Sequence, residues 1–184
     1  MKRILVAYAS KHGSTRDVAV SIAGRLHAVG HDVELLPASG VSSIDRYDGV
    51  VLGGALYMGR LRKDARVFLE DHRVQLAHTP LAIFALGPRT LSPADVAASR
   101  AQLDAALAPL VVAPALVTVF GGAVDPTKLH FPFSRMQATD ARDWHAIVAW
   151  ADDVGKSFRR ARADGAETVI WGLQPRRELS RSRG

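Results

Sequence analysis

Short apolar runs alternate with longer segments of helical spacing along most of this chain. A short run bounded by turn residues predicts a strand, and apolar positions that recur every three or four residues predict a helix buried on one face. The five predicted strands span residues 4–9, 32–36, 49–54, 80–86 and 114–120. The predicted helices begin near residues 14, 62, 92 and 139. Strands that alternate with helices indicate an α/β fold, in which a parallel sheet is covered by helices on both faces.

Several element ends carry recognisable signals. Ser92 followed by Pro93 is typical of a helix N-cap and the first helical position. Thr139 or Asp140 is the expected cap of the last helix. We also expect a loop at residues 55–61 and an extra strand at residues 168–171. A single helical turn is expected to begin at Ser42 or Ser43.

The carboxyl ends of the predicted strands carry most of the glycines and hydroxyls. In a doubly wound parallel sheet, ligands bind outside these ends, near the point where the strand order reverses. We therefore expect a ligand site where four loops converge. These loops are residues 10–15, 53–59, 86–91 and the segment from residue 121 onward.

The turn at residues 10–15 has the sequence S-K-H-G-S-T and leads from an apolar strand directly into a helix. Such a turn points several backbone N–H groups at one spot, and the helix dipole adds partial positive charge there. Three hydroxyls, a lysine and a glycine within six residues favour an anion site, most often for phosphate. The alternative is that Ser14 or Ser10 only caps the helix.

Other phosphate-binding motifs are absent from the sequence. No G-x-x-x-x-G-K-S/T run occurs, which excludes a nucleotide-binding P-loop, and no G-x-G-x-x-G follows the first strand. A response-regulator receiver would carry acidic residues at the end of the first strand, where this chain has Ser10 and Lys11. One phosphate held by hydroxyls and N–H groups, with a planar group between two further loops, fits flavin mononucleotide (FMN).

The segment Y-A-S-K-H-G-S-T-R resembles the phosphate-binding loop of the flavodoxin family. Four further segments resemble its branch of flavodoxin-type, menaquinone-dependent protoporphyrinogen dehydrogenases: D-R-Y-D-G-V-V-L-G, G-G-A-L-Y-M-G-R-L, F-G-G-A-V-D-P-T-K-L and D-W-H-A-I-V-A-W-A. The similarity covers about residues 3–160. It implies a flavodoxin-like three-layer αβα sandwich whose five-stranded parallel sheet has the order 2-1-3-4-5, with FMN as the cofactor.

The resemblance also implies which residues hold FMN. Its phosphate would be bound by Ser10, Lys11, His12, Gly13, Ser14 and Thr15. The flavin ring would lie against Ala55, Leu56, Tyr57, Met58 and Gly59 on one side and Leu86, Gly87, Pro88 and Arg89 on the other, with Gly122 and Ala123 at its border. Tyr57 is the expected aromatic contact, the alternative being a surface aromatic that fills the loop. No catalytic acid or base and no metal site is predicted.

Composition and charge limit the remaining possibilities. With 184 residues we expect one domain at residues 1–163, followed by a basic tail at residues 164–184. The chain has no cysteine, which excludes disulfides, a thiolate nucleophile and cysteine-ligated metals. Residues 1–155 carry 16 Lys and Arg against 15 Asp and Glu, whereas the last 29 residues carry eight against three. The excess positive charge therefore lies in the last 29 residues and does not indicate a nucleic-acid-binding domain.

The leading interpretation is an FMN-dependent oxidoreductase or electron-transfer protein, acting on a porphyrinogen, a quinone or a protein redox partner. The alternative is a non-enzymatic binding module of the same fold that has lost flavin redox function. A start that is too short and too early for a signal peptide, and the absence of cysteine, predict a cytoplasmic location. A further hypothesis is weak contact between the basic tail and an anionic membrane surface.

Overall fold

The computed structural model describes residues 1–124, 127 and 138–170, and in its sheet five strands run parallel. Their order is β2-β1-β3-β5-β6, and the short β4 pairs antiparallel with β3 beside this path. With β4 set aside, this is the predicted order 2-1-3-4-5. The five parallel strands are β1 (Arg3–Ala9), β2 (Asp32–Pro37), β3 (Gly49–Tyr57), β5 (Leu81–Leu86) and β6 (Leu116–Phe120).

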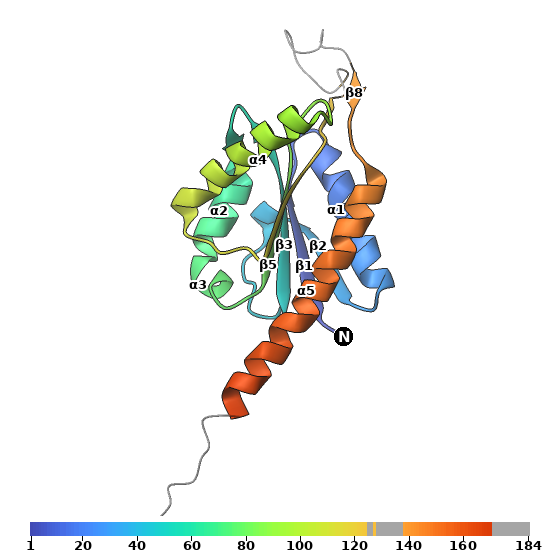
Figure 1. Ribbon diagram of the computed structural model, residues 1–184. Coiled ribbons are helices and arrows are strands. Elements are labelled where there is room, and N and C mark those ends of the chain that lie inside the picture. The colour runs from blue at the N-terminus through green and yellow to red at the C-terminus, as the bar shows by residue number, and fades with distance from the viewer. Residues whose placement is uncertain (125–126, 128–137, 171–184) are drawn as a thin grey trace, which may run out of the picture.

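Helices cover both faces of this sheet, so the predicted three-layer sandwich is confirmed (Figure 1). Along β1, Ile4 and Val6 pack with α1 and α5, whereas Leu5 and Ala7 pack with α2, α3 and α4 on the other face. This alternation follows from the two-residue period of a strand, which turns successive side chains to opposite faces. The helices are α1 (Ser14–Ala28), α2 (Lys63–Asp71), α3 (Arg73–Leu76), α4 (Pro93–Leu107) and α5 (Trp144–Ile170).

The remaining described elements are short. Two 3-10 turns follow β2 and α4, and a separate pair of antiparallel strands joins the segment after β6 to the segment before α5. These elements are η1 (Ala38–Gly40), η2 (Ala108–Leu110), β4 (Arg60–Leu61), β7 (Ala123–Val124) and β8 (Thr139–Asp140).

The cap of α4 is the predicted one, but the cap of α5 is not. The Oγ of Ser92 accepts a hydrogen bond from the Asp95 N–H at 3.1 Å, with proline at the first helical position. Thr139 and Asp140 do not cap α5, because they are extended and pair with β7. The Oδ1 of Asp143 instead accepts the N–H groups of residues 145 and 146, both at 3.0 Å.

Two further expectations are wrong. Residues 168–170 belong to α5 and not to an extra strand; residue 171 lies outside the described residues. The 3-10 turn after β2 lies at residues 38–40, and Ser43 begins no helical turn. Its Oγ accepts the Asp45 N–H at 3.1 Å and donates to the Asp45 carboxylate at 2.8 Å, which closes a local turn instead.

The last helix, α5, extends past the predicted boundary between the domain and the tail. The helix continues across residues 163 and 164 and reaches Ile170. The rest of the predicted tail, residues 171–184, lies outside the described residues. Within the part of the chain that the structure describes, none of the helices is long and apolar enough to cross a membrane.

His31 is a buried titratable group between α1 and β2, and it is 4% exposed. Its Nε2 lies 3.0 Å from Nη1 of Arg159 on α5. A guanidinium can only donate, so Nε2 accepts and the imidazole is neutral. Burial, and then the positive charges of Arg159, the N-terminal amino group and Lys2, lower the pKa of His31 below its usual value.

We expect this lowered pKa to make the fold less stable as the pH falls below about 6.5. In that range His31 binds a proton in the unfolded chain but not in the folded chain. This group therefore lowers the free energy of unfolding by at most about 1.4 kcal/mol per pH unit. Urea unfolding of the wild type and of His31→Gln at about pH 7.5 and pH 5.5 tests this expectation. The wild type should lose more stability on acidification, and an equal loss in both proteins would contradict it.

Candidate functional site

The register of the parallel strands brings the predicted loops to one edge of the sheet. Ala9 at the end of β1 pairs with Gly54 of β3. Leu86 at the end of β5 pairs with Ala55 of β3 on one side and with Phe120 of β6 on the other. The carboxyl ends of β1, β3, β5 and β6 therefore lie in one row. Figure 1 shows the start of α4 and the β8 strand at this end of the sheet, opposite α3.

The turn between β1 and α1 has the geometry of an anion site. Gly13 is the N-cap of α1 with φ 99°, a left-handed conformation that favours glycine. The Oγ of Ser10 accepts the Gly13 N–H at 3.1 Å, which fixes the turn, and no side chain caps the helix. The first N–H groups of α1 have no partner inside the helix. Neither the Ser10 hydroxyl nor the Ser14 hydroxyl therefore caps the helix.

The other predicted phosphate residues frame this turn. Lys11 is exposed and adds positive charge at its rim, while Ser14 and His12 are half-buried. Thr15 is almost fully buried at the first turn of α1. The donor set thus combines hydroxyls, backbone N–H groups and an ammonium, which is the chemistry that a phosphate monoester requires.

Arg142 is a residue at this edge that sequence reasoning missed. Its guanidinium binds both oxygens of Asp140, at 2.8 and 2.6 Å, and reaches Asp17 in the first turn of α1 at 3.2 Å. It also lies 4.9 Å from the ring centroid of Trp144. These bonds lower the pKa of Asp140 and raise the pKa of Arg142. Arg142 therefore ties the start of α5 to the start of the helix that carries the phosphate turn.

The predicted loop at residues 55–61 is a β-hairpin instead. The β3 strand continues to Tyr57, and Tyr57 and Leu56 pair with the two residues of β4. Met58 and Gly59 form the two-residue turn with φ 49° and 73°, the backbone pattern that matches the twist of paired strands. The sequence lacks the usual Asn-Gly turn signal, which is why its glycines suggested a loop.

The hairpin presents one aromatic ring of the predicted site to solvent. Tyr57 is 63% exposed, and Ala55 and Leu56 are half-buried. Gly59 at the turn faces α4, since a Cβ built there would lie 4.0 Å from Cγ of Gln102. The hairpin therefore stands at the carboxyl edge of the sheet, packed beside α4 at its turn and with Tyr57 exposed.

The loops after β5 and β6 are joined to each other by backbone hydrogen bonds. Gly122 N–H donates to the Pro88 carbonyl at 2.8 Å, and Gly87 N–H donates to the Phe120 carbonyl at 3.1 Å. A Cβ at Gly122 would lie 3.4 Å from the Gly87 oxygen, which is ordinary van der Waals contact between the two loops. The structure thus brings together the predicted residues of these two loops.

Not every predicted residue can present a side chain to a ligand. Leu86 and Pro88 are buried, and Leu86 packs in the core under α1 and α5, so these two offer their backbones. Arg89 is exposed, and Ala123 is half-buried at the start of β7. Neither Trp144 nor Trp150 is among the predicted residues: Trp150 packs edge-on against Phe84 and Phe120, at 6.0 and 5.8 Å, and Trp144 lies on the surface of α5.

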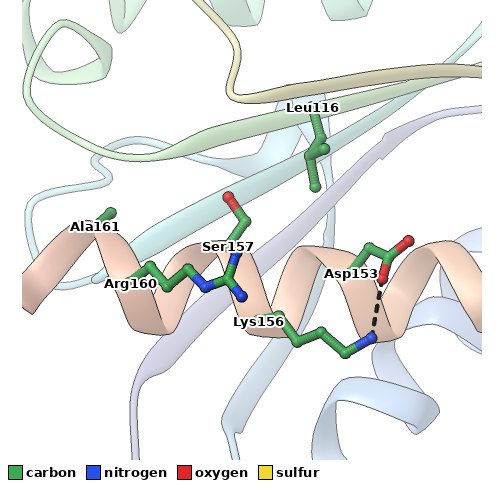
Figure 2. A pocket seen from close by; sticks show the side chains of 6 residues that line it. All are labelled: Leu116, Asp153, Lys156, Ser157, Arg160 and Ala161. Carbon is green, nitrogen blue, oxygen red and sulfur yellow. Dashed lines mark hydrogen bonds and ion pairs between the residues drawn. The ribbon is translucent and has the colours of Figure 1, made fainter.

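A groove of about 470 Å³ lies elsewhere, where α5 passes Leu116 at the start of β6 (Figure 2). Figure 2 shows an ion pair along α5, in which Nζ of Lys156 lies 3.1 Å from Oδ1 of Asp153. The groove lies at the amino end of β6, and none of its lining residues belongs to the predicted site. Those residues are Leu116, Asp153, Lys156, Ser157, Arg160 and Ala161.

Comparison with solved structures shows the same fold in flavodoxins and in part of an oxidoreductase. Flavodoxin 1 from Bacillus cereus matches with a TM-score of 0.52 at 18% identity, over 86% of this chain and 97% of that chain. A flavodoxin mutant from Pseudomonas aeruginosa gives 0.53 at 17% identity, over 85% and 99%. Rubredoxin oxygen:oxidoreductase from Desulfovibrio gigas gives 0.60 at 12% identity, over 88% of this chain but 37% of that chain. No curated protein matches the sequence.

A family model described as a flavodoxin domain matches residues 5–137, well over half of the chain. The matched segment contains the phosphate turn, the hairpin and the joined loops after β5 and β6. The donor chemistry of the turn and the close approach of the glycine loops are compatible with a phosphate and a flat ring. The chain therefore belongs to the flavodoxin-domain family, and this membership points to FMN as its cofactor.

Proposed function

We propose that this protein holds FMN at the carboxyl edge of its sheet and exchanges electrons between the flavin and a redox partner. The observation that carries the proposal is the turn before α1, where Gly13 at positive φ and the Ser10 hydroxyl shape a helix N-terminus for an anion. Family membership supports FMN as the group that brings this anion.

Each part of the site has a proposed role. Ser10, Ser14 and Thr15, together with the N–H groups of the turn, would bind the phosphate oxygens, and Lys11 and His12 would add positive charge. Tyr57 would lie against one face of the ring, with the rest of the hairpin beside it. The backbone of residues 86–89 and of Gly122 and Ala123 would enclose the other side.

Bound FMN supplies the hydride and electron transfer, and the protein supplies orientation and exclusion of water. The side chains at the edge include no arrangement that demands an acid or a base for this chemistry. From the resemblance of the sequence to menaquinone-dependent protoporphyrinogen dehydrogenases, we propose a porphyrinogen or a quinone as a candidate small-molecule substrate, with a protein as the other class of redox partner.

A second candidate function is anion binding without flavin redox activity. It is favoured by Lys11 and His12, which place a cation and an imidazole in the turn. In such a module the turn would bind another phosphate-bearing ligand, and Tyr57 would be a surface residue.

The visible absorption spectrum of the purified protein separates the two functions. After incubation with FMN and removal of the excess, we expect the protein to retain the two visible bands of oxidised flavin. A protein that stays colourless but binds inorganic phosphate, detected by calorimetry, would contradict the redox function and support the binding module. For a protein that retains flavin, the next measurement is its reoxidation by a quinone and its reduction by a porphyrinogen.

A further inference from the structure

We propose that the exposed surface beside the FMN site docks an acidic redox protein. This surface, named here the hairpin face, consists of Tyr57, Met58 and Arg89 at the margin of the proposed FMN site, together with Arg60, Lys63 and Leu91 next to it. The proposal rests on the electron transfer proposed above and adds the chemical nature of the partner. The hairpin face has an exposed apolar residue and three unpaired cations, and these residues come from two neighbouring loops.

Met58 is the exposed apolar residue of the hairpin face, and its backbone adopts a strained conformation. Its φ of 49° is left-handed, a conformation that glycine, asparagine or aspartate adopts with less strain. The side chain is nevertheless 86% exposed, so no packing in the fold repays this strain. Strain retained at an exposed position is typical of a functional site. Leu91, which is 51% exposed on the loop after β5, extends the apolar area.

The positive charges around Met58 have no partners. Arg60, Lys63 and Arg89 are exposed, and among the described residues none of them forms an ion pair. Arg60 lies directly across the hairpin from Tyr57, and Lys63 begins α2 two residues after β4. Arg89 follows β5, the strand that pairs with the end of β3. Three unpaired cations therefore follow two adjacent strand ends at the same edge of the sheet.

The carboxylates at the same edge are engaged elsewhere. Asp64 pairs with Arg62 at 3.2 Å, and Asp140 pairs with Arg142 at 2.6 Å. The carboxylate of Asp95 accepts the hydroxyl of Thr90 at the start of α4. Asp64 and Asp140 are thus paired with cations, whereas Asp95 keeps its negative charge; the three unpaired cations outnumber it, so the hairpin face carries net positive charge.

Electrostatic complementarity then selects the partner. Redox proteins form small, short-lived interfaces in which charge steers the encounter and an apolar centre excludes water. A positive rim favours a partner whose own electron-transfer face carries carboxylates. The cations are distributed over two loops and not gathered in one pocket, which favours docking of a protein over binding of a small anion.

The test uses two soluble haem proteins of opposite charge, the acidic haem domain of cytochrome b5 and basic cytochrome c. The FMN-loaded protein is first reduced by light, with a tertiary amine such as EDTA as the sacrificial electron donor. The reduced flavin then gives one electron to each haem, whose iron changes from Fe(III) to Fe(II). Rates are measured at about 20 mM and about 500 mM salt. We expect the rate with the acidic protein to fall as salt is added and the rate with the basic protein to rise or stay constant. The reverse pattern would overturn the proposal.

Variants localise the effect. Arg60→Glu combined with Lys63→Glu should slow reduction of the acidic haem protein about tenfold at low salt. Arg73→Glu, a reversal of an exposed cation on α3 at the opposite end of the sheet, should leave the rate unchanged. Met58→Asn should keep or raise the melting temperature while weakening docking, because it relieves the strained turn and removes the apolar contact. Equal rates in all variants would contradict the assignment of the hairpin face.

A binding measurement without flavin keeps this proposal separate from the proposed function. Calorimetry of the apoprotein with the acidic haem domain should show binding that Arg60→Glu with Lys63→Glu abolishes, whether or not FMN is retained. If the apoprotein instead binds phosphatidylserine vesicles through these residues and ignores the haem domain, the partner is a membrane and the protein-docking proposal is wrong.

Discussion

Lys11→Glu is expected to weaken FMN binding about 100-fold, which corresponds to about 2.7 kcal/mol. The substitution removes an ammonium from the rim of the proposed phosphate turn and puts a carboxylate in its place. A doubly negative phosphate then meets like charge where it met opposite charge. Because Lys11 is exposed, the fold should tolerate the change. Quenching of flavin fluorescence in a titration of the apoprotein measures the affinity.

Two controls make this result specific to the phosphate. Riboflavin has the same ring without the phosphate, so its affinity should be the same for the wild type and Lys11→Glu. Arg73→Glu makes the same change of net charge at the other end of the sheet and should leave FMN affinity intact. An equal loss for riboflavin and FMN would mean that the substitution disturbs the ring site, and an unchanged FMN affinity would place the phosphate elsewhere.

Gly53→Ala is expected to destabilise the fold by about 3 kcal/mol, because it inserts a methyl group into a filled core. Gly53 lies opposite Phe84 in the β3–β5 pair, and a Cβ at this position would overlap the Phe84 ring. That ring is fully buried and packs against Phe120 and Trp150, so it has little room to move. Urea unfolding followed by circular dichroism measures the loss.

Gly24→Ala is the matched control for this substitution. A Cβ at Gly24 in α1 meets no atom within 4 Å, so helix propensity alone should raise stability by up to about 1 kcal/mol. Combining Gly53→Ala with Phe84→Leu should restore part of the loss, since the smaller side chain leaves space for the new methyl group. If Gly53→Ala and Gly24→Ala had the same effect, the close contact with Phe84 would not limit the core.

The local patterns of the sequence predicted the architecture correctly. Apolar runs and helical spacing predicted the five parallel strands and the helices between them. Strands and helices bury side chains at different spacings, and these spacings can be recognised in the sequence. The S-K-H-G-S-T turn was located for the same reason: strand, glycine turn and helix start are consecutive, and their shared geometry follows from a few neighbouring residues. Ser92 and Pro93 at the start of α4 are a similar local signal.

Local patterns failed where a distant segment decides the conformation. Thr139 and Asp140 are good helix caps by type, yet pairing with β7 holds them extended and leaves the cap to Asp143. Backbone hydrogen bonds between separate segments here outweigh the residues' own preference. The hairpin at residues 55–61 was missed for a different reason: Leu56 and Tyr57 pair with their near neighbours Leu61 and Arg60, but the turn lacks the usual Asn-Gly signal.

The sequence by itself thus determined the fold class, the strand order once its family resemblance was included, and the place of the proposed phosphate turn. Only the tertiary structure decided which residues stabilise the carboxyl edge of the sheet and where the cations at this edge lie. Arg142 reaches Asp17 across 125 positions, and Arg60 and Arg89 come to one side through the pairing of β3 with β5. Contacts of this kind depend on which strands are neighbours, and no pattern within a short stretch of the chain encodes them.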